Sequence, residues 1–173
     1  TATGDIADDA ITAAKVDPAQ TDITSLGTLT TLTVDNIIIN GTTIGHTSDT
    51  DAISIASSGV TTFSAAVVGA TDTDTSNTGS VTLDFAANQN FILTFTGNVT
   101  LANPSTEAVG QSGIIVCIQD GTGSRTLSLG TDYETAGGSG ITLSTAASSV
   151  DVIPYFVKAS GSIQLGAVQK AFA

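Results

Sequence analysis

The chain has 173 residues, of which 16 are acidic and only 4 are Lys or Arg, so its formal net charge is −12. Four cations neutralise too few phosphates for electrostatic binding of nucleic acid, and the single cysteine cannot form a disulfide within the chain. The 18 glycines follow no three-residue period, which excludes a collagen, and 40% hydrophobic residues argue against disorder. The composition therefore indicates a β-rich protein with few chemically reactive side chains.

Residues 1–20 read TATGDIADDAITAAKVDPAQ and are predicted to form an N-terminal arm. A helical spacing can be drawn through the arm, but its apolar face is mostly alanine and too weak to be stable alone. The arm therefore needs neighbours from its own chain or from other copies. The acidic start shows no signal peptide, and no apolar run in the chain is long enough to insert into a membrane.

Residues 21–70 alternate aliphatic residues with Thr and Ser at spacings of two to three, which predicts short β-strands. Asn40-Gly41 between β-branched runs is the strongest signal for a tight hairpin turn in the chain. Strands so poor in aromatic residues cannot close a core within one chain. We therefore expect an intertwined stalk in which strands from several chains pair; a β-solenoid within one chain is the alternative, although fifty residues make a poor stack.

Residues 71–79 contain no apolar residue and are predicted to be a linker. Beyond them, residues 80–173 show short strand patterns separated by Gly-, Asn- and Pro-containing turns, with no helical period. This spacing predicts an all-β domain, an antiparallel β-sandwich like a jelly roll. Its core is predicted to contain Phe85, Phe91, Phe95, Tyr155 and Phe156. Cys117 lies in an apolar run, IIVCI, and is expected to act as a small core hydrophobe.

His46 is the only imidazole, and Ser48 and Asp49 beside it supply the residue types of a Ser-His-Asp triad. A triad needs a nucleophile on a rigid elbow, and the chain contains no Gly-x-Ser-x-Gly sequence. A solvent-facing histidine at the end of a strand is the preferred interpretation.

The aspartates at 72 and 74, followed by Ser76 and Asn77, resemble the opening of a calcium loop, but Leu83 stands where the loop needs a closing Glu. Glu107 and Glu134 lie in loop-like segments and are expected to be solvated. The sequence therefore predicts no catalytic residue, no metal ligand and no cofactor, and the chain is not expected to be an enzyme.

Two segments carry a resemblance to a known family. Residues 4–16, GDIADDAITAAKV, resemble the GDIADGAITSAKI type of element in tail-fibre proteins of bacteriophages, especially marine ones. Residues 32–44, LTVDNIIINGTTI, are similar to the LTVDNITINGNTI elements of the same fibres, and residues 81–173 look like the end domain of such structural proteins. The resemblance implies a virion component, a homotrimeric fibre or spike attached through its N-terminus and presenting a β-sandwich on the external surface of the particle.

The pattern and the resemblance together predict an anchoring and trimerising arm (1–20), a trimeric stalk (21–70), a linker (71–79) and an outward head (80–173). The expected partners are two further copies, other virion proteins (tail, portal-adaptor or capsid) and a host-surface glycan or protein, with the loops at 103–112, 120–124 and 130–140 exposed for contact. The predicted trimer or anchor contacts are Ile6, Ile11, Val16, Leu29, Leu32, Ile37, Ile39 and Ile44.

Three alternatives remain open on the sequence. A head-fibre or decoration protein would lay its arm along a capsid and stabilise the shell. A carbohydrate-binding module or depolymerase fragment would recognise host polysaccharide, with Tyr133 as the aromatic contact to test. A bacterial surface adhesin would carry a cleavable signal upstream.

Overall fold

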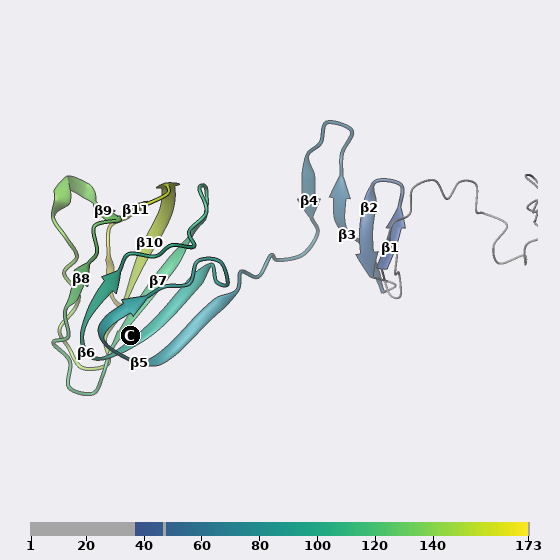
Figure 1. Ribbon diagram of the computed structural model, residues 1–173. Coiled ribbons are helices and arrows are strands. Elements are labelled where there is room, and N and C mark those ends of the chain that lie inside the picture. Colours follow the sequence, from purple (N-terminus) through teal and green to yellow (C-terminus); the bar gives the residue numbers. More distant parts are fainter. Residues whose placement is uncertain (1–36, 47, 173) are drawn as a thin grey trace, which may run out of the picture. The chain divides into compact units, whose positions relative to one another are not determined.

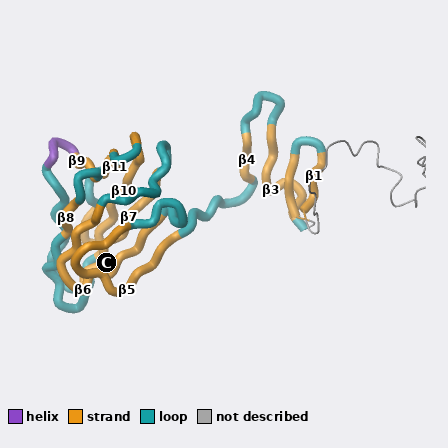
Figure 2. The backbone as a smooth tube through the Cα atoms, in the orientation of Figure 1, coloured by secondary structure: helices purple, strands orange, loops and turns teal. Residues whose placement is uncertain are grey.

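The structure is a computed structural model that describes residues 37–46 and 48–172, and it divides the chain into two units, Thr1–Ala66 and Val67–Ala173. The described residues of both units form β-strands and loops, apart from a short 3-10 turn at Ala136–Gly138 (Figures 1 and 2). The all-β prediction is confirmed. The predicted arm and the contacts at Ile6, Ile11, Val16, Leu29 and Leu32 lie outside the described residues.

The described part of the N-terminal unit is a four-stranded antiparallel meander in the order β1-β2-β3-β4. Its strands are β1 (Ile37–Asn40), β2 (Thr43–His46), β3 (Asp49–Ile55) and β4 (Thr61–Phe63). The hairpin predicted at Asn40-Gly41 is confirmed, and Gly41 has the positive φ of 60° that such a tight turn requires.

The expected pairing of stalk strands between chains is wrong for residues 37–63, because these strands pair with one another within a single chain. Short turns join consecutive strands, so the loop-closure entropy of each hairpin is small. A contact between copies would use the side chains of this meander or the outer edges of β1 and β4, which end the strand order.

The C-terminal unit contains one eight-stranded sheet in the order β5-β6-β7-β10-β11-β9, with β12 paired to β10 and β8 paired to β6. Its strands are β5 (Thr71–Thr82), β6 (Asn90–Ala102), β7 (Ser112–Gln119), β8 (Leu127–Leu129), β9 (Tyr133–Thr135), β10 (Val150–Ala159), β11 (Ser162–Leu165) and β12 (Gln169–Phe172). Figure 1 shows the long strands β5, β6, β7 and β10 as a curved sheet.

The pairing in this sheet is mixed, so the predicted antiparallel jelly roll is wrong in its topology. β6 pairs in parallel with β5, β7 and β8, and β9 pairs in parallel with β11. β10 is antiparallel to β7, β11 and β12. Period-two patterns give the same signal for both kinds of pairing, so only the connections between strands distinguish them.

The connection from β5 to β6 explains the curvature. Residues 83–89 span at most about 25 Å, whereas a straight twelve-residue strand is about 40 Å long. β5 therefore has to bend for the chain to return to the start of β6, and its register shifts on both sides of Asn77. The return passes over the core face, where Leu83 is 2% and Phe85 3% exposed. Leu83 and Phe85 thus belong to a loop that crosses the core face rather than to a strand.

The predicted linker at 71–79 is also wrong, because these residues form most of β5. β5 stands at the end of the strand order, and its side chains are exposed on both faces except at a few positions. An edge strand with little burial tolerates Thr, Asp and Ser throughout, and aspartates discourage pairing with other chains. The domain boundary lies at Ala66–Val67 instead.

A single core fills the concave side of the sheet. Phe85 contacts Phe91 at a ring-centroid distance of 5.1 Å and Tyr155 at 5.2 Å, and Cys117 is 2% exposed, as predicted. Burial raises the pKa of the Cys117 thiol to about 12. Phe156 is the exception among the predicted core aromatics: it faces away from the core and is 46% exposed. Strand alternation places neighbouring Tyr155 and Phe156 on opposite faces.

Asp151 fastens the C-terminal strand to the sheet from inside the core. The carboxylate is 2% exposed and accepts hydrogen bonds from the Ser144 N–H at 2.6 Å, the Ser144 hydroxyl at 2.7 Å and the Ala171 N–H at 2.8 Å. Burial opposes ionisation, but these hydrogen bonds outweigh it and hold the pKa of Asp151 below its ordinary value.

Two buried tyrosines provide a matched test of this packing. The Tyr155 hydroxyl donates to the Gln89 carbonyl at 2.6 Å, whereas the Tyr133 hydroxyl is buried with no partner among the described residues. We expect Tyr155→Phe to lower the free energy of unfolding by about 1 kcal/mol, and Tyr133→Phe to leave it unchanged or raise it. Urea denaturation of both variants measures this; equal losses would contradict the assigned hydrogen bonding.

Asp151 gives the domain a pH dependence of defined sign. A carboxylate with a lowered native pKa stabilises the fold above its unfolded pKa of about 4, and this contribution is lost as the pH falls from there through the native pKa. We expect Asp151→Asn to lower the free energy of unfolding at pH 7 by about 1–3 kcal/mol. The variant should also lose less stability than the wild type between pH 5 and pH 3. Asp51→Asn, at an exposed position, is the control, and an equal acid loss in all three chains would contradict the assignment.

Candidate functional site

The meander of the N-terminal unit carries a row of apolar side chains across all four strands. Ile39 lies opposite Ile44, Ile44 opposite Ile53, and Ile53 opposite Phe63. Directly opposed residues of antiparallel strands share one face of the sheet. These four residues are called the apolar row below, and they include two of the predicted trimer contacts, Ile39 and Ile44.

The apolar row has no core beneath it in the described part of the chain. Ile39 is 65% and Phe63 52% exposed, Ile44 and Ile53 are partly exposed, and none of the four belongs to the core cluster. On the opposite face Thr43 of β2, Ser54 of β3 and Thr62 of β4 lie opposite one another in turn, and all three are polar. Ile37 lies opposite His46 in β1 and β2. The meander is therefore amphipathic, with its apolar side unpaired by the described residues.

The C-terminal unit has a shallow depression of about 490 Å³ where β9, β10 and β11 meet. Phe156 and Pro154 from β10 supply its apolar side, and Glu134 and Gln164 supply its polar side. Gln164 lies opposite Phe156 in the β10–β11 pairing, so the amide stands beside the half-exposed ring. A flat aromatic surface flanked by planar polar groups suits a ligand with both apolar faces and hydroxyl groups.

The carboxylate of Glu134 at the depression is fixed by two neighbouring side chains. Glu134 accepts hydrogen bonds from the Ser162 hydroxyl at 2.7 Å and from Lys158 Nζ at 3.1 Å. These two contacts, with Ser162 the stronger influence, hold the pKa of Glu134 below its ordinary value. The predicted loop position of Glu134 is wrong, since the residue belongs to β9, but its side chain is 42% exposed and so in contact with solvent, as expected. Tyr133, expected as an exposed aromatic contact, is only 6% exposed.

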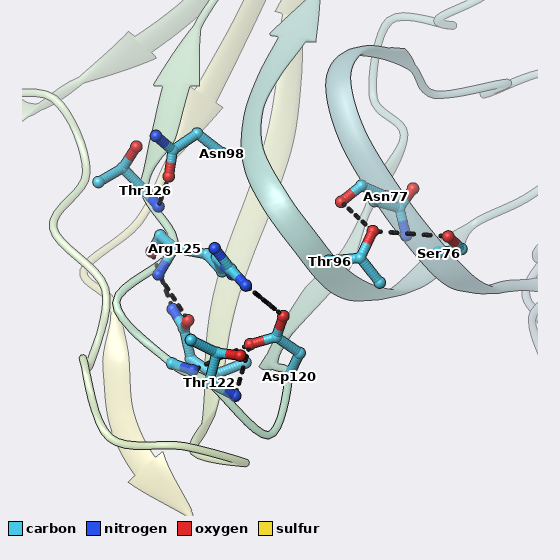
Figure 3. A network of polar contacts seen from close by, with 10 residues as sticks. Ser76, Asn77, Thr96, Asn98, Asp120, Thr122, Arg125 and Thr126 are labelled. Carbon is cyan, nitrogen blue, oxygen red and sulfur yellow. Dashed lines mark hydrogen bonds and ion pairs between the residues drawn. The ribbon is translucent and has the colours of Figure 1, made fainter.

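The loop at 120–124 is stabilised by its own polar network (Figure 3). Asp120 accepts hydrogen bonds from Arg125 Nη2 at 2.7 Å and from the N–H groups of Thr122 and Gly123 at 3.0 and 2.9 Å. The Arg125 hydrogen bond is the main reason that the pKa of Asp120 is below its ordinary value. Gln119 ties the same loop by exchanging hydrogen bonds with the backbone of Arg125. This loop therefore presents a fixed shape.

The residues considered for catalysis and metal binding do not form a joint site. His46 is exposed, and its Nδ1 accepts a hydrogen bond from the Ser48 N–H at 3.1 Å. Within residues 37–46 and 48–172, no three His, Cys, Asp or Glu side chains come together at metal-binding distance. No helix in that same part of the chain is long and apolar enough to cross a membrane.

The sequence did not predict the depression, because it depends on the parallel pairing of β9 with β11, which brings Glu134 beside Gln164. The two strands are separated by β10 in the chain, so no local sequence pattern indicates that they pair. The only available signal was Phe156 next to Tyr155, since alternation forces one of two adjacent aromatics outward.

Comparison with known families gives one match. Residues 78–162 match the family described as "Putative phage tail fibre C-terminal domain". The matched stretch begins within β5 and extends to the first residue of β11, so it contains the whole of β6, β7 and β10. Searches of curated proteins and of solved structures found no match.

A tail fibre domain implies a virion-associated protein that associates with other virion components, and it suggests a structural role. The all-β fold of the C-terminal unit is consistent with such a domain. The match therefore supports a phage tail fibre protein, whose C-terminal domain the chain resembles over residues 78–162.

Proposed function

We propose that the chain is a non-enzymatic, trimeric fibre or spike component of a bacteriophage, attached to the particle through its N-terminal region and displaying its C-terminal domain on the outer surface. The observation that carries the trimer is the apolar row. Ile39 and Phe63 are more than half exposed, and the meander that holds them has no core of its own in the described residues.

A four-stranded sheet of this size needs a partner for its apolar face to be stable in water. Copies of the chain can supply that partner. Each copy carries a net charge of −12 and repels the others, but the four residues of the row are uncharged, so contact between rows adds no repulsion of its own. Three rows packed around an axis would bury the isoleucines and Phe63 together, and the polar faces would remain in solvent. Ile37, another of the predicted contacts, belongs to β1 as well.

The outward role of the C-terminal domain draws on the depression at Phe156 and on the fixed loop at 120–124. Both are formed by short segments between or at the ends of strands, where binding residues are commonly placed on a rigid scaffold. Contact with a glycan of the host surface is the second candidate, favoured by the exposed Phe156 ring beside Gln164 and Glu134.

The trimer can be tested with two adjacent residues of β4, whose side chains lie on opposite faces of the meander. We expect native mass measurement of the full chain to give three times the chain mass of 17.2 kDa. Phe63→Asp should weaken association at least tenfold, because burial of one phenylalanine contributes about 1.5–3 kcal/mol per copy. Thr62→Asp adds the same charge on the opposite face and should leave the trimer intact. A monomeric wild type, or equal effects of the two variants, would contradict the proposal.

Glycan contact can be tested with two phenylalanines of similar exposure. Phe156, at the depression, is 46% exposed, and Phe172, on β12 outside it, is 49% exposed. We expect Phe156→Ala to weaken binding of the full chain to host surface polysaccharide severalfold and Phe172→Ala to leave binding unchanged. Wild-type chain that binds no such polysaccharide, or equal losses in both variants, would contradict a glycan contact at this site.

A further inference from the structure

The depression at Phe156 continues into a second depression along the edge of the sheet. The second has a volume of about 310 Å³ and is lined by the ends of β9 and β11 with the segments that follow them. Figure 1 shows β9, β10 and β11 close together, and β9 stands at one end of the strand order. The two depressions share the lining residues Thr135, Ala136, Leu165 and Gly166. Because they share these walls, they form one continuous surface feature, called the groove below.

Hydrogen bonds within the chain fix the walls of the groove. On one wall the Gly140 N–H donates to Thr135 Oγ1 at 2.9 Å, and on the other the Gly166 N–H donates to the Pro154 carbonyl at 2.8 Å. A Cβ atom at Gly166 would lie 2.7 Å from Pro154 Cγ, so glycine lets this segment approach β10 closely. The groove is therefore formed before a ligand arrives, and binding requires little ordering of the protein.

The groove combines apolar surfaces with hydrogen-bonding side chains along its length. Phe156 and Pro154 lie in the first depression, and Ile141 and Val168 lie in the second. A sugar ring has matching properties, with C–H groups on its faces and hydroxyl groups around its rim. Two successive apolar surfaces fit a chain of such rings better than a single ring. The hydrogen-bonding side chains of the groove are those of Glu134, Thr135, Ser139 and Gln164.

The backbone of the groove argues against a peptide as the ligand. An extended peptide binds by adding a strand to a sheet edge, which requires a row of free backbone N–H and carbonyl groups. β9 has only three residues, and the N–H groups of Gly140 and Gly166 on the walls already donate within the chain. Sugar hydroxyls need no such row, because they donate to side chains and accept from them.

Glu134 gives the groove a preference among sugars. It is the only charged residue among the described residues that line the two depressions. Lys158 cannot serve an acidic ligand freely, because its ammonium group is held by Glu134 at 3.1 Å. An ionised carboxylate accepts strong hydrogen bonds from sugar hydroxyls, whereas it repels the carboxylate, sulfate or phosphate group of an acidic sugar. The groove therefore suits sugars without charge.

We propose that the groove binds an uncharged polysaccharide along several consecutive sugar units, with one ring on Phe156 and the following rings in the second depression. The inference rests on the proposed glycan contact and adds two properties of the ligand, its charge and its length. Glu134 selects the charge in the first depression, and the shared wall at Thr135 and Ala136 directs the chain into the second.

The charge of the ligand is tested with the full-length chain on an array of neutral and acidic bacterial surface polysaccharides. We expect the wild type to bind neutral polysaccharides only. Glu134→Gln should weaken that binding severalfold, because an amide is a weaker acceptor than a carboxylate, and Glu107→Gln, outside the groove, should leave it unchanged. Preferred binding to acidic polysaccharides, or equal effects of the two variants, overturns this inference and leaves the glycan contact at Phe156 standing. Binding to no polysaccharide of the array overturns both.

The length of the ligand is tested with oligosaccharides cut from the polysaccharide that binds. Wild-type affinity should rise at least about tenfold from the disaccharide to the hexasaccharide, since only the longer ligand reaches both depressions. Ser139→Trp places a bulky side chain in the second depression and should remove this rise while the disaccharide still binds. Ser80→Trp on β5, at the opposite end of the strand order, is the control, and circular dichroism checks that each variant folds. Equal wild-type affinity for all lengths, or a rise that survives Ser139→Trp, overturns the extended groove and leaves the contact at Phe156 standing.

Discussion

A sheet that carries aliphatic side chains must cover them, and this requirement governs both units of the chain. In the C-terminal unit the core face is covered by curling: β5 bends, the 83–89 segment crosses the concave side, and Leu83 and Phe85 pack into the aromatic cluster around Tyr155. In the N-terminal unit the described strands are short and contain a single aromatic residue, Phe63, so they do not curl around a core of their own. Among the described residues of the N-terminal unit, the apolar row is left without a core to cover it.

Polar side chains stabilise the curved sheet at its bulge, at its last strand and at the loop after β7. Asn77, 1% exposed at the bulge of β5, donates to the carbonyls of Asp74 and Thr94, both at 3.1 Å. Asp151 holds the last strand, and Asp120 with Arg125 holds the loop after β7. Each of these groups satisfies backbone donors or acceptors that a bent sheet leaves without ladder partners. Their side chains act on local geometry, which agrees with a structural part that presents a fixed surface.

A fibre component needs stability in assembly and a defined outer surface, and the distribution of charge serves both. The acidic residues are spread over edges and loops such as β5 and 120–124, where they keep the surface solvated and discourage strand addition. The four residues of the apolar row, by contrast, are uncharged. Association through uncharged faces and repulsion elsewhere would restrict copies to one arrangement, which is how a strongly acidic chain can form a specific oligomer.

The sequence by itself determined the all-β class, the Asn40-Gly41 hairpin, the buried Cys117 and most of the aromatic core, because alternation and turn residues are local signals. Of the predicted contacts, Ile39 and Ile44 lie in the apolar row, and their role between copies stays a prediction. It could not show that residues 71–79 form a strand, since polar residues on an edge look like a linker, nor that β6 pairs in parallel. Nor could it place Phe156 beside Gln164. Only the tertiary structure decided these features, because strand order and register depend on contacts between residues far apart in the chain, which local periodicity does not encode.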